Sequence, residues 1–73
     1  MNIPARLLDV VELIEDLPKC GLYRGERGTI VEILSSDVYL VEFSNADGCI
    51  REMPDVYSDQ FKVVYQHLRE EVA

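Results

Sequence analysis

The fold of this chain is decided by the stretch Gly21-Leu22-Tyr23-Arg24-Gly25-Glu26-Arg27-Gly28-Thr29-Ile30-Val31-Glu32-Ile33-Leu34. Glycine tolerates positive φ angles, so Gly25 and Gly28, which bracket a charged pair, predict a tight turn. The β-branched run over residues 29–34 suits a half-buried strand, in which Val31 and Ile33 are predicted to face inward. A turn that leads straight into such a strand is typical of the central hairpin of a small β-barrel.

The next strand is predicted over residues 38–44, after a turn formed by residues 35–37. Its side chains alternate, with Tyr39, Val41 and Phe43 on the inner face. A hairpin loop over residues 45–48 follows, with Gly48 in the left-handed position. Residues 49–53 then form a strand that ends at Pro54, which has no N–H to donate to a sheet.

Residues 9–17 allow two interpretations. With a helical period, Leu7, Leu8, Val11 and Ile14 fall on one face. With a period of two, the same stretch reads as a strand. The turn-forming residues 18–21 favour the strand, and so does the family resemblance given below.

The remaining residues complete the predicted domain. Residues 56–59 predict a single helical turn and residues 60–65 a last strand, while residues 1–8 form a lead-in and 66–73 a polar tail. We therefore expect an all-β domain over residues 9–65, a small SH3-like barrel of about five antiparallel strands with a short helical turn before the last one. Its predicted inner residues are Val11, Leu13, Val31, Ile33, Tyr39, Val41, Phe43 and Phe61.

Length and charge restrict the function. Seventy-three residues build one domain, with a core too small for a carved catalytic pocket. Fourteen acidic against seven basic residues give a formal charge of −7, which disfavours nucleic-acid binding. No apolar run approaches the ~20 residues that cross a bilayer, and no signal peptide is evident, so we expect a cytoplasmic protein.

No motif predicts catalysis, a metal or a cofactor. The pair Gly25-x-x-Gly28 lacks the Lys-Ser/Thr of a phosphate-binding loop. Cys20 and Cys49 are predicted to be small core residues, and their spacing with His67 does not favour a zinc site. The carboxylates of Glu12, Glu15 and Asp16 are predicted to form a solvated edge.

Several motifs together carry a family resemblance: Asp9-Val10-Val11, Glu15-Asp16-Leu17-Pro18, Leu22-x-Arg24-Gly25-x-x-Gly28-Thr29-Ile30-Val31-Glu32-Ile33-Leu34, Tyr39-x-Val41-Glu42-Phe43, Asp47-Gly48 and Asp59-Gln60-Phe61-x-Val63. Over residues 7–64 the chain resembles the bacterial family named domain of unknown function 4926. The resemblance implies a free-standing SH3-like domain from small two-gene modules, including toxin–antitoxin-type pairs. It implies no catalytic residues. Residues 52–58 depart from the family pattern.

A shorter resemblance supports an alternative. The segment Gly25-x-x-Gly28-Thr29-Ile30-Val31-Glu32 is similar to KOW-type segments of ribosomal and transcription proteins. It implies a ribosome- or RNA-associated module, and a housekeeping domain without a dedicated partner is a further alternative.

The candidate functional residues lie in loops and acidic turns. Residues 28–61 contain seven acids and one base, Arg51. Tyrosine is enriched in binding hot spots, so we predict that Tyr57 anchors a protein partner within an acidic belt of Asp47, Glu52, Asp55 and Asp59. Tyr23 and Arg24 form a second candidate contact; both tyrosines could instead cap the barrel ends. The predicted partner is the product of an adjacent gene, a toxin-like protein or an enzyme, which this protein restrains as an antitoxin or immunity protein would.

Overall fold

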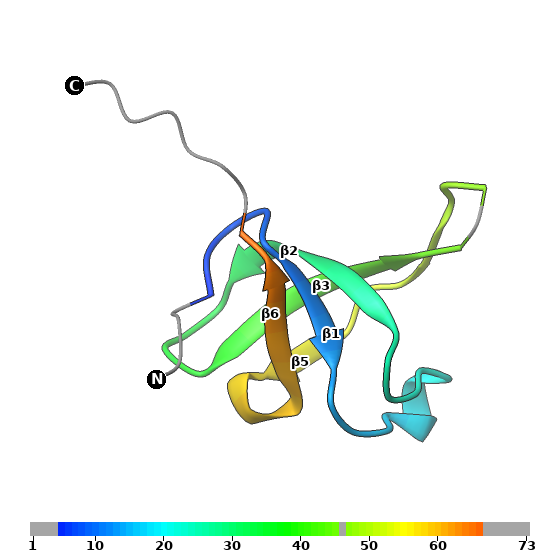
Figure 1. Ribbon diagram of the computed structural model, residues 1–73, viewed down its shortest axis with the longest axis horizontal. Coiled ribbons are helices and arrows are strands. Elements are labelled where there is room, and N and C mark those ends of the chain that lie inside the picture. The colour runs from blue at the N-terminus through cyan, green and yellow to red at the C-terminus, as the bar shows by residue number, and fades with distance from the viewer. Residues whose placement is uncertain (1–4, 46, 67–73) are drawn as a thin grey trace.

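The computed structural model describes residues 5–45 and 47–66, which form an all-β fold (Figure 1). Its strands are β1 (Val10–Leu13), β2 (Arg27–Ile33), β3 (Val38–Ser44), β4 (Ile50–Glu52), β5 (Asp55–Tyr57) and β6 (Phe61–Tyr65). Two short 3-10 turns, η1 (Pro18–Cys20) and η2 (Ser58–Gln60), are the helical segments of the described residues. None of these is a helix long and apolar enough to cross a membrane.

All pairings in the sheet are antiparallel, in the order β4-β3-β2-β1-β6, and β5 also pairs with β3. β4 and β5 follow one another along the same edge of β3, since Phe43 lies opposite Glu52 and Leu40 opposite Asp55. Pro54 separates the two strands, and its carbonyl accepts the N–H of Val41 at 3.1 Å. Because β4 and β5 share one edge of β3, the six strands fill five positions across the sheet. The sequence predicted about five strands.

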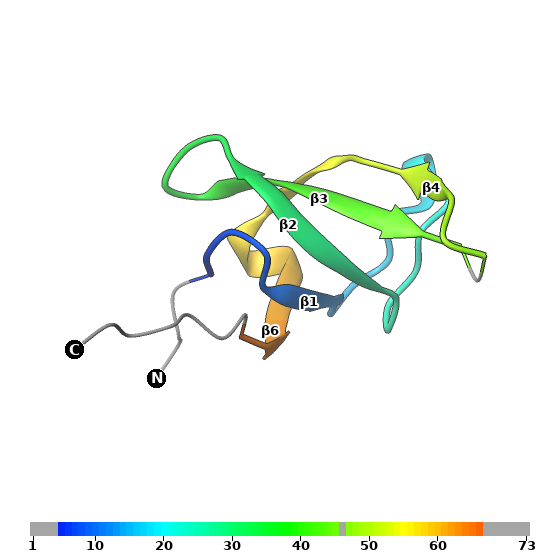
Figure 2. The same ribbon diagram turned by 90° about the horizontal axis from the view of Figure 1, so that it is seen from above.

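The sheet curls around a single core, which gives the barrel-like shape seen in Figure 2. Across the interior, the rings of Tyr39 on β3 and Phe61 on β6 meet edge to face at 5.4 Å. The buried apolar residues are Val11, Leu13, Leu22, Ile30, Tyr39, Val41, Phe43, Val56 and Phe61. The small all-β fold and six of the eight predicted inner residues are thus confirmed.

The prediction of inner residues on β2 is wrong for Val31, which is half-buried, while Ile30 is fully buried. Ile33 lies opposite the buried Tyr39 and so points to the inner face as predicted, but at the end of β2 it is 45% exposed. Ile30 lies opposite the buried Val41, and the pairing of β2 with β3 shifts between Ile30 and Glu32. Such a bulge adds one residue to one strand, so the alternation changes phase at that point.

Residues 10–13 form a strand, which confirms the extended interpretation of the ambiguous segment, although the strand is shorter than residues 9–17. The helical turn predicted over residues 56–59 lies instead at Ser58–Gln60. Val56 is fully buried opposite Tyr39, and this pairing requires extended backbone through Tyr57. The tail predicted over residues 66–73 lies outside the described residues except for Gln66.

The two glycines of the central stretch have different roles. Gly25 has φ +95 in a turn closed by the bond from Glu26 N–H to the carbonyl of Tyr23, at 3.1 Å. Gly28 lies inside β2, where an added Cβ would come within 2.7 Å of Val41 Cγ1 and 2.9 Å of Phe43 Cε2. The prediction of one turn containing both glycines is therefore wrong for Gly28, which serves close packing.

Candidate functional site

The strongest candidate surface is the outer side of the sheet where β2, β3 and β5 lie together. Residues directly opposite one another in antiparallel strands point to the same face. Leu40 lies opposite Glu32 on one side and Asp55 on the other, and Val38 lies opposite Tyr57. We name this set, Glu32, Val38, Leu40, Asp55 and Tyr57, the acidic sheet face.

The short strand β5 orients the two central residues of this face. Val56 is fully buried, so its neighbours Asp55 and Tyr57 must point outward. Tyr57 is 55% exposed, while Val38 and Leu40 on the neighbouring strand are half-buried. The result is an exposed aromatic ring beside aliphatic side chains, with a carboxylate on each side of Leu40.

Hydrogen bonds hold the backbone that carries Tyr57. The N–H of Tyr57 donates to Gln60 Oε1 at 2.9 Å, and the N–H of Ser58 donates to the carbonyl of Asp37 at 2.8 Å. Gln60 also connects η2 to the loop between β1 and β2, since its Nε2 donates to Glu15 Oε2 at 3.1 Å and its carbonyl accepts from the N–H of Ile14 at 2.9 Å. These bonds hold the backbone at Tyr57, the last residue of β5, in one conformation.

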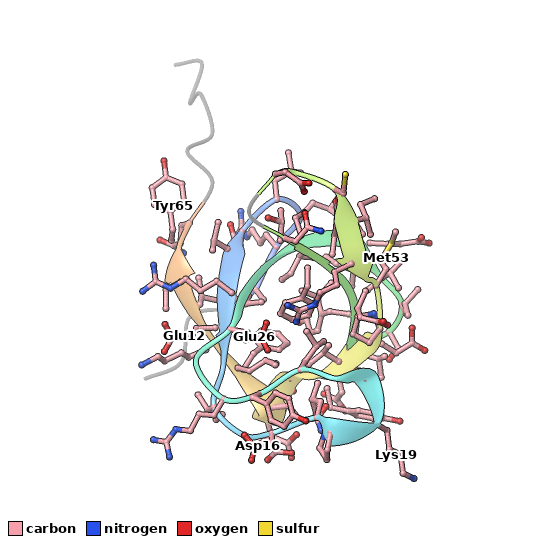
Figure 3. The ribbon with its side chains drawn as sticks, turned by 90° about the vertical axis from the view of Figure 1, so that its right-hand side faces the viewer. Glu12, Asp16, Lys19, Glu26, Met53 and Tyr65 are labelled. Carbon is pink, nitrogen blue, oxygen red and sulfur yellow. The ribbon has the colours of Figure 1, made fainter. Side chains whose placement is uncertain are left out.

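Charge is divided between two sides of the molecule. Among the described residues, Glu12 pairs with Arg27 at 3.0 Å and with Lys62 at 3.8 Å, and Glu26 pairs with Arg51. Glu12 lies among basic side chains on the β1 side of the sheet (Figure 3). In the described parts of the chain, the carboxylates of the acidic sheet face take part in none of these ion pairs. Their negative charge is left facing solvent.

The other predicted acidic residues are spread along the chain. Asp59 is exposed on η2, two residues beyond Tyr57, and Glu52 is exposed on β4. Asp47 lies in the loop that follows β3, whereas Tyr57 pairs with the first residue of that strand. Its Oδ1 accepts the N–H of Cys49 at 3.4 Å, a local role in the loop. The structure thus places Asp55 and Tyr57 on one face of β5 and Asp59 on the turn that follows, and it separates Asp47 from them.

Tyr23 and Arg24 form a different feature, the tip of the β1–β2 loop. The N–H of Tyr23 donates to Glu26 Oε2 and that of Arg24 to Asp16 Oδ1, both at 2.9 Å. The Tyr23 side chain is 51% exposed. Leu22, just before it, is fully buried and anchors the tip to the core.

Sequence reasoning missed three members of the acidic sheet face: Glu32, Val38 and Leu40. The alternation of residues 38–44 already places Leu40 on the outer face. Its neighbours Glu32 and Asp55 follow only from the register of strands that are distant in sequence.

The other carboxylates and the two cysteines do not form a further candidate site in the described residues. Glu12 pairs with Arg27 and Lys62. Glu15 accepts a hydrogen bond from the Gln60 side chain, and Asp16 accepts one from the N–H of Arg24. Cys20 packs against the core, but Cys49 is exposed, which corrects its prediction as a core residue. Within residues 5–45 and 47–66, no group of three or more His, Cys, Asp or Glu side chains is arranged to hold a metal ion. His67 lies outside these ranges.

Comparison with protein families gives one finding. Residues 7–63, well over half of the 73-residue chain, match the family described as Domain of unknown function (DUF4926). No curated protein and no solved structure matches the chain.

Proposed function

We propose that this chain, which belongs to the family described as Domain of unknown function (DUF4926), is a non-enzymatic protein-interaction module that binds its partner through the acidic sheet face. One observation carries the proposal. Tyr57 is 55% exposed at the end of β5, opposite Val38 and on the same face as Asp55, whose carboxylate is in no ion pair of the described residues. A fold of one chain does not need a large aromatic side chain at such a position.

The physical chemistry of this face suits a basic protein surface. Opposed charge accelerates encounter, and the acidic side chains reject other acidic surfaces. Burial of Tyr57 in a pocket of the partner would supply much of the binding energy, since a hot-spot residue contributes ~2 kcal/mol or more. Asp55, Glu32 and Asp59 would lie around that anchor and fix its orientation.

The proposed partner is the product of an adjacent gene, a toxin-like protein or an enzyme, which this chain restrains as an antitoxin or immunity protein does. The family resemblance supports this role, because it implies a protein encoded in a small two-gene module. The size of the domain also supports it, because a protein that only covers another protein's surface needs no pocket of its own.

The charge distribution favours a protein partner over RNA. Of the six basic side chains of the described residues, Arg27, Arg51 and Lys62 are each paired with a glutamate. Affinity for nucleic acid comes mainly from cations that neutralise phosphates, and a formal charge of −7 opposes the approach of a polyanion. In a gel shift at low salt we expect no retained RNA, and micromolar binding that falls steeply with salt would favour the KOW-like alternative.

The test is co-expression of the full chain with the neighbouring gene's product, followed by affinity purification and titration of the purified pair. We expect Tyr57→Ala and Asp55→Lys each to weaken binding ~10-fold or more, the equivalent of ~1.4 kcal/mol. Tyr65→Ala is the matched control, because Tyr65 is 60% exposed on another side of the sheet. Binding that is unchanged by both variants would refute the assigned surface, and no binding at micromolar concentration would refute the proposed function.

A further inference from the structure

Leu40 lies at the centre of the acidic sheet face and has acidic side chains on three sides. It lies opposite Glu32 of β2 and opposite Asp55 of β5, so these three side chains point to the outer face. Glu42, two residues further along β3, points to the same face and borders it. In the described residues, none of these three carboxylates takes part in an ion pair. An apolar centre is thus surrounded by negative charge that the chain itself does not neutralise.

The spacing of these groups suits a flat cation. Neighbouring strands lie about 4.8 Å apart, so the backbones that carry Glu32 and Asp55 are about 10 Å from one another, on either side of Leu40. Leu40 is half-buried, and Tyr57 lies diagonally across from it, at a spacing that aromatic and long side chains bridge. A group placed over Leu40 therefore meets apolar side chains with its face and carboxylates with its edge.

Of the two strongly basic side chains, arginine has the chemistry that this arrangement requires. Its guanidinium is planar and weakly hydrated, stacks on aromatic rings, and donates several N–H groups around its edge to carboxylates. The lysine ammonium is a compact, strongly hydrated point charge, which must lose water to lie against a leucine. The negative charge attracts both cations, and the apolar centre discriminates between them.

We infer that the acidic sheet face receives an arginine of its partner, with the guanidinium over Leu40 and its N–H groups directed to Glu32 and Asp55. Tyr57 lies beside the same guanidinium and stacks against it. The arginine is then part of the pocket in which the partner buries Tyr57. The inference rests on the proposed function, since it states the chemistry of the partner at the same surface: a protein with an arginine at the centre of its basic contact.

The experiment is an NMR titration of the isotope-labelled full chain with capped glycine pentapeptides that carry one central arginine, lysine or citrulline. NMR suits the weak binding of a single side chain. We expect the arginine peptide to shift the amide signals of Leu40, Asp55 and Tyr57 and to bind ~3-fold or more tightly than the lysine peptide. The citrulline peptide keeps the shape of arginine without its charge, and it should give no saturable binding.

Matched variants locate the arginine. Asp55→Asn removes one carboxylate beside Leu40 and should raise the Kd of the arginine peptide ~3-fold or more. Asp16→Asn makes the same change of charge on the β1–β2 loop, keeps the Oδ1 acceptor for the N–H of Arg24, and should leave this Kd nearly unchanged. Tyr57→Leu removes the aromatic ring and should reduce the preference for arginine over lysine.

The peptides require no partner protein, so the two proposals can fail separately. A neighbouring gene's product that does not bind would refute the proposed function and leave the preference for arginine intact. Equal affinity for the arginine and lysine peptides, or no saturable binding of either, would overturn the inference. An equal loss in Asp16→Asn and Asp55→Asn would also overturn it, because it would show long-range attraction in place of a contact, and so would an undiminished preference in Tyr57→Leu.

Discussion

At the scale of single residues, Gly28 shows how tightly β2 packs against β3. An added methyl group would meet Val41 Cγ1 at 2.7 Å and Phe43 Cε2 at 2.9 Å, and both of these side chains belong to the core. We expect Gly28→Ala to lower the free energy of unfolding by about 1–3 kcal/mol through overpacking, as measured by urea denaturation.

Gly48→Ala is the matched control for that prediction. Gly48 has φ +89, but nothing lies within 4 Å of an added Cβ. Its substitution therefore adds only the conformational cost of a positive φ, about 1 kcal/mol. If Gly28→Ala is no more destabilising than Gly48→Ala, the packing explanation for Gly28 is wrong.

At the scale of elements, the β1–β2 loop is a folded unit despite its length. Leu17 and Leu22 form an isolated bridge across η1, and Gly25 donates its N–H to the carbonyl of Leu13 at 2.9 Å. The carboxylate of Glu26 binds Arg51 of β4 through one oxygen and the N–H of Tyr23 through the other. These contacts attach the loop to both the core and the neighbouring strand.

Gln60 connects this loop to the segment that carries Tyr57, through bonds of 3.1 Å to Glu15 and 2.9 Å from the N–H of Tyr57. We expect Gln60→Ala to accelerate hydrogen exchange of the Tyr57 amide, because it loses an acceptor worth about 1 kcal/mol. Glu15→Ala keeps that acceptor and removes only the partner of the Gln60 Nε2 donor. The Tyr57 amide should then remain protected in Glu15→Ala, and equal exchange in both variants would contradict the assigned bond.

At the scale of the whole molecule, the dominant feature is the uneven charge. The formal charge is −7, and ion pairs among the described residues engage only two acidic side chains, Glu12 and Glu26. These pairs are partly exposed, so each contributes about 0–1 kcal/mol. We therefore expect repulsion among the remaining carboxylates to outweigh these ion pairs.

It follows that salt should stabilise this protein. Raising NaCl over the range in which the Debye length falls below ~10 Å should increase the urea midpoint without changing the slope of the transition. KCl at matched ionic strength is the control, because screening depends on ionic strength and not on the monovalent cation used. A midpoint that falls as salt rises would show that the ion pairs, rather than the repulsion, dominate the electrostatic free energy.

Much of the fold could be predicted because its signals are local. The alternation of residues 38–44 and the turn residues on either side placed β3 at Val38–Ser44 with Tyr39, Val41 and Phe43 buried. The left-handed Gly48 followed from the hairpin sequence in the same way. Each of these depends only on neighbouring residues, through the period of a strand and the φ angles that glycine permits.

The tertiary structure decided what depends on pairing between distant segments. The pairing of Ile30 with the buried Val41 places Ile30 in the core, and the pairing of Val56 with Tyr39 holds Val56 in a strand rather than in a helical turn. The acidic turn around Tyr57 was visible in the sequence by itself. Its companions Leu40 and Glu32 were not, because a one-residue change of register would have moved them to the other face.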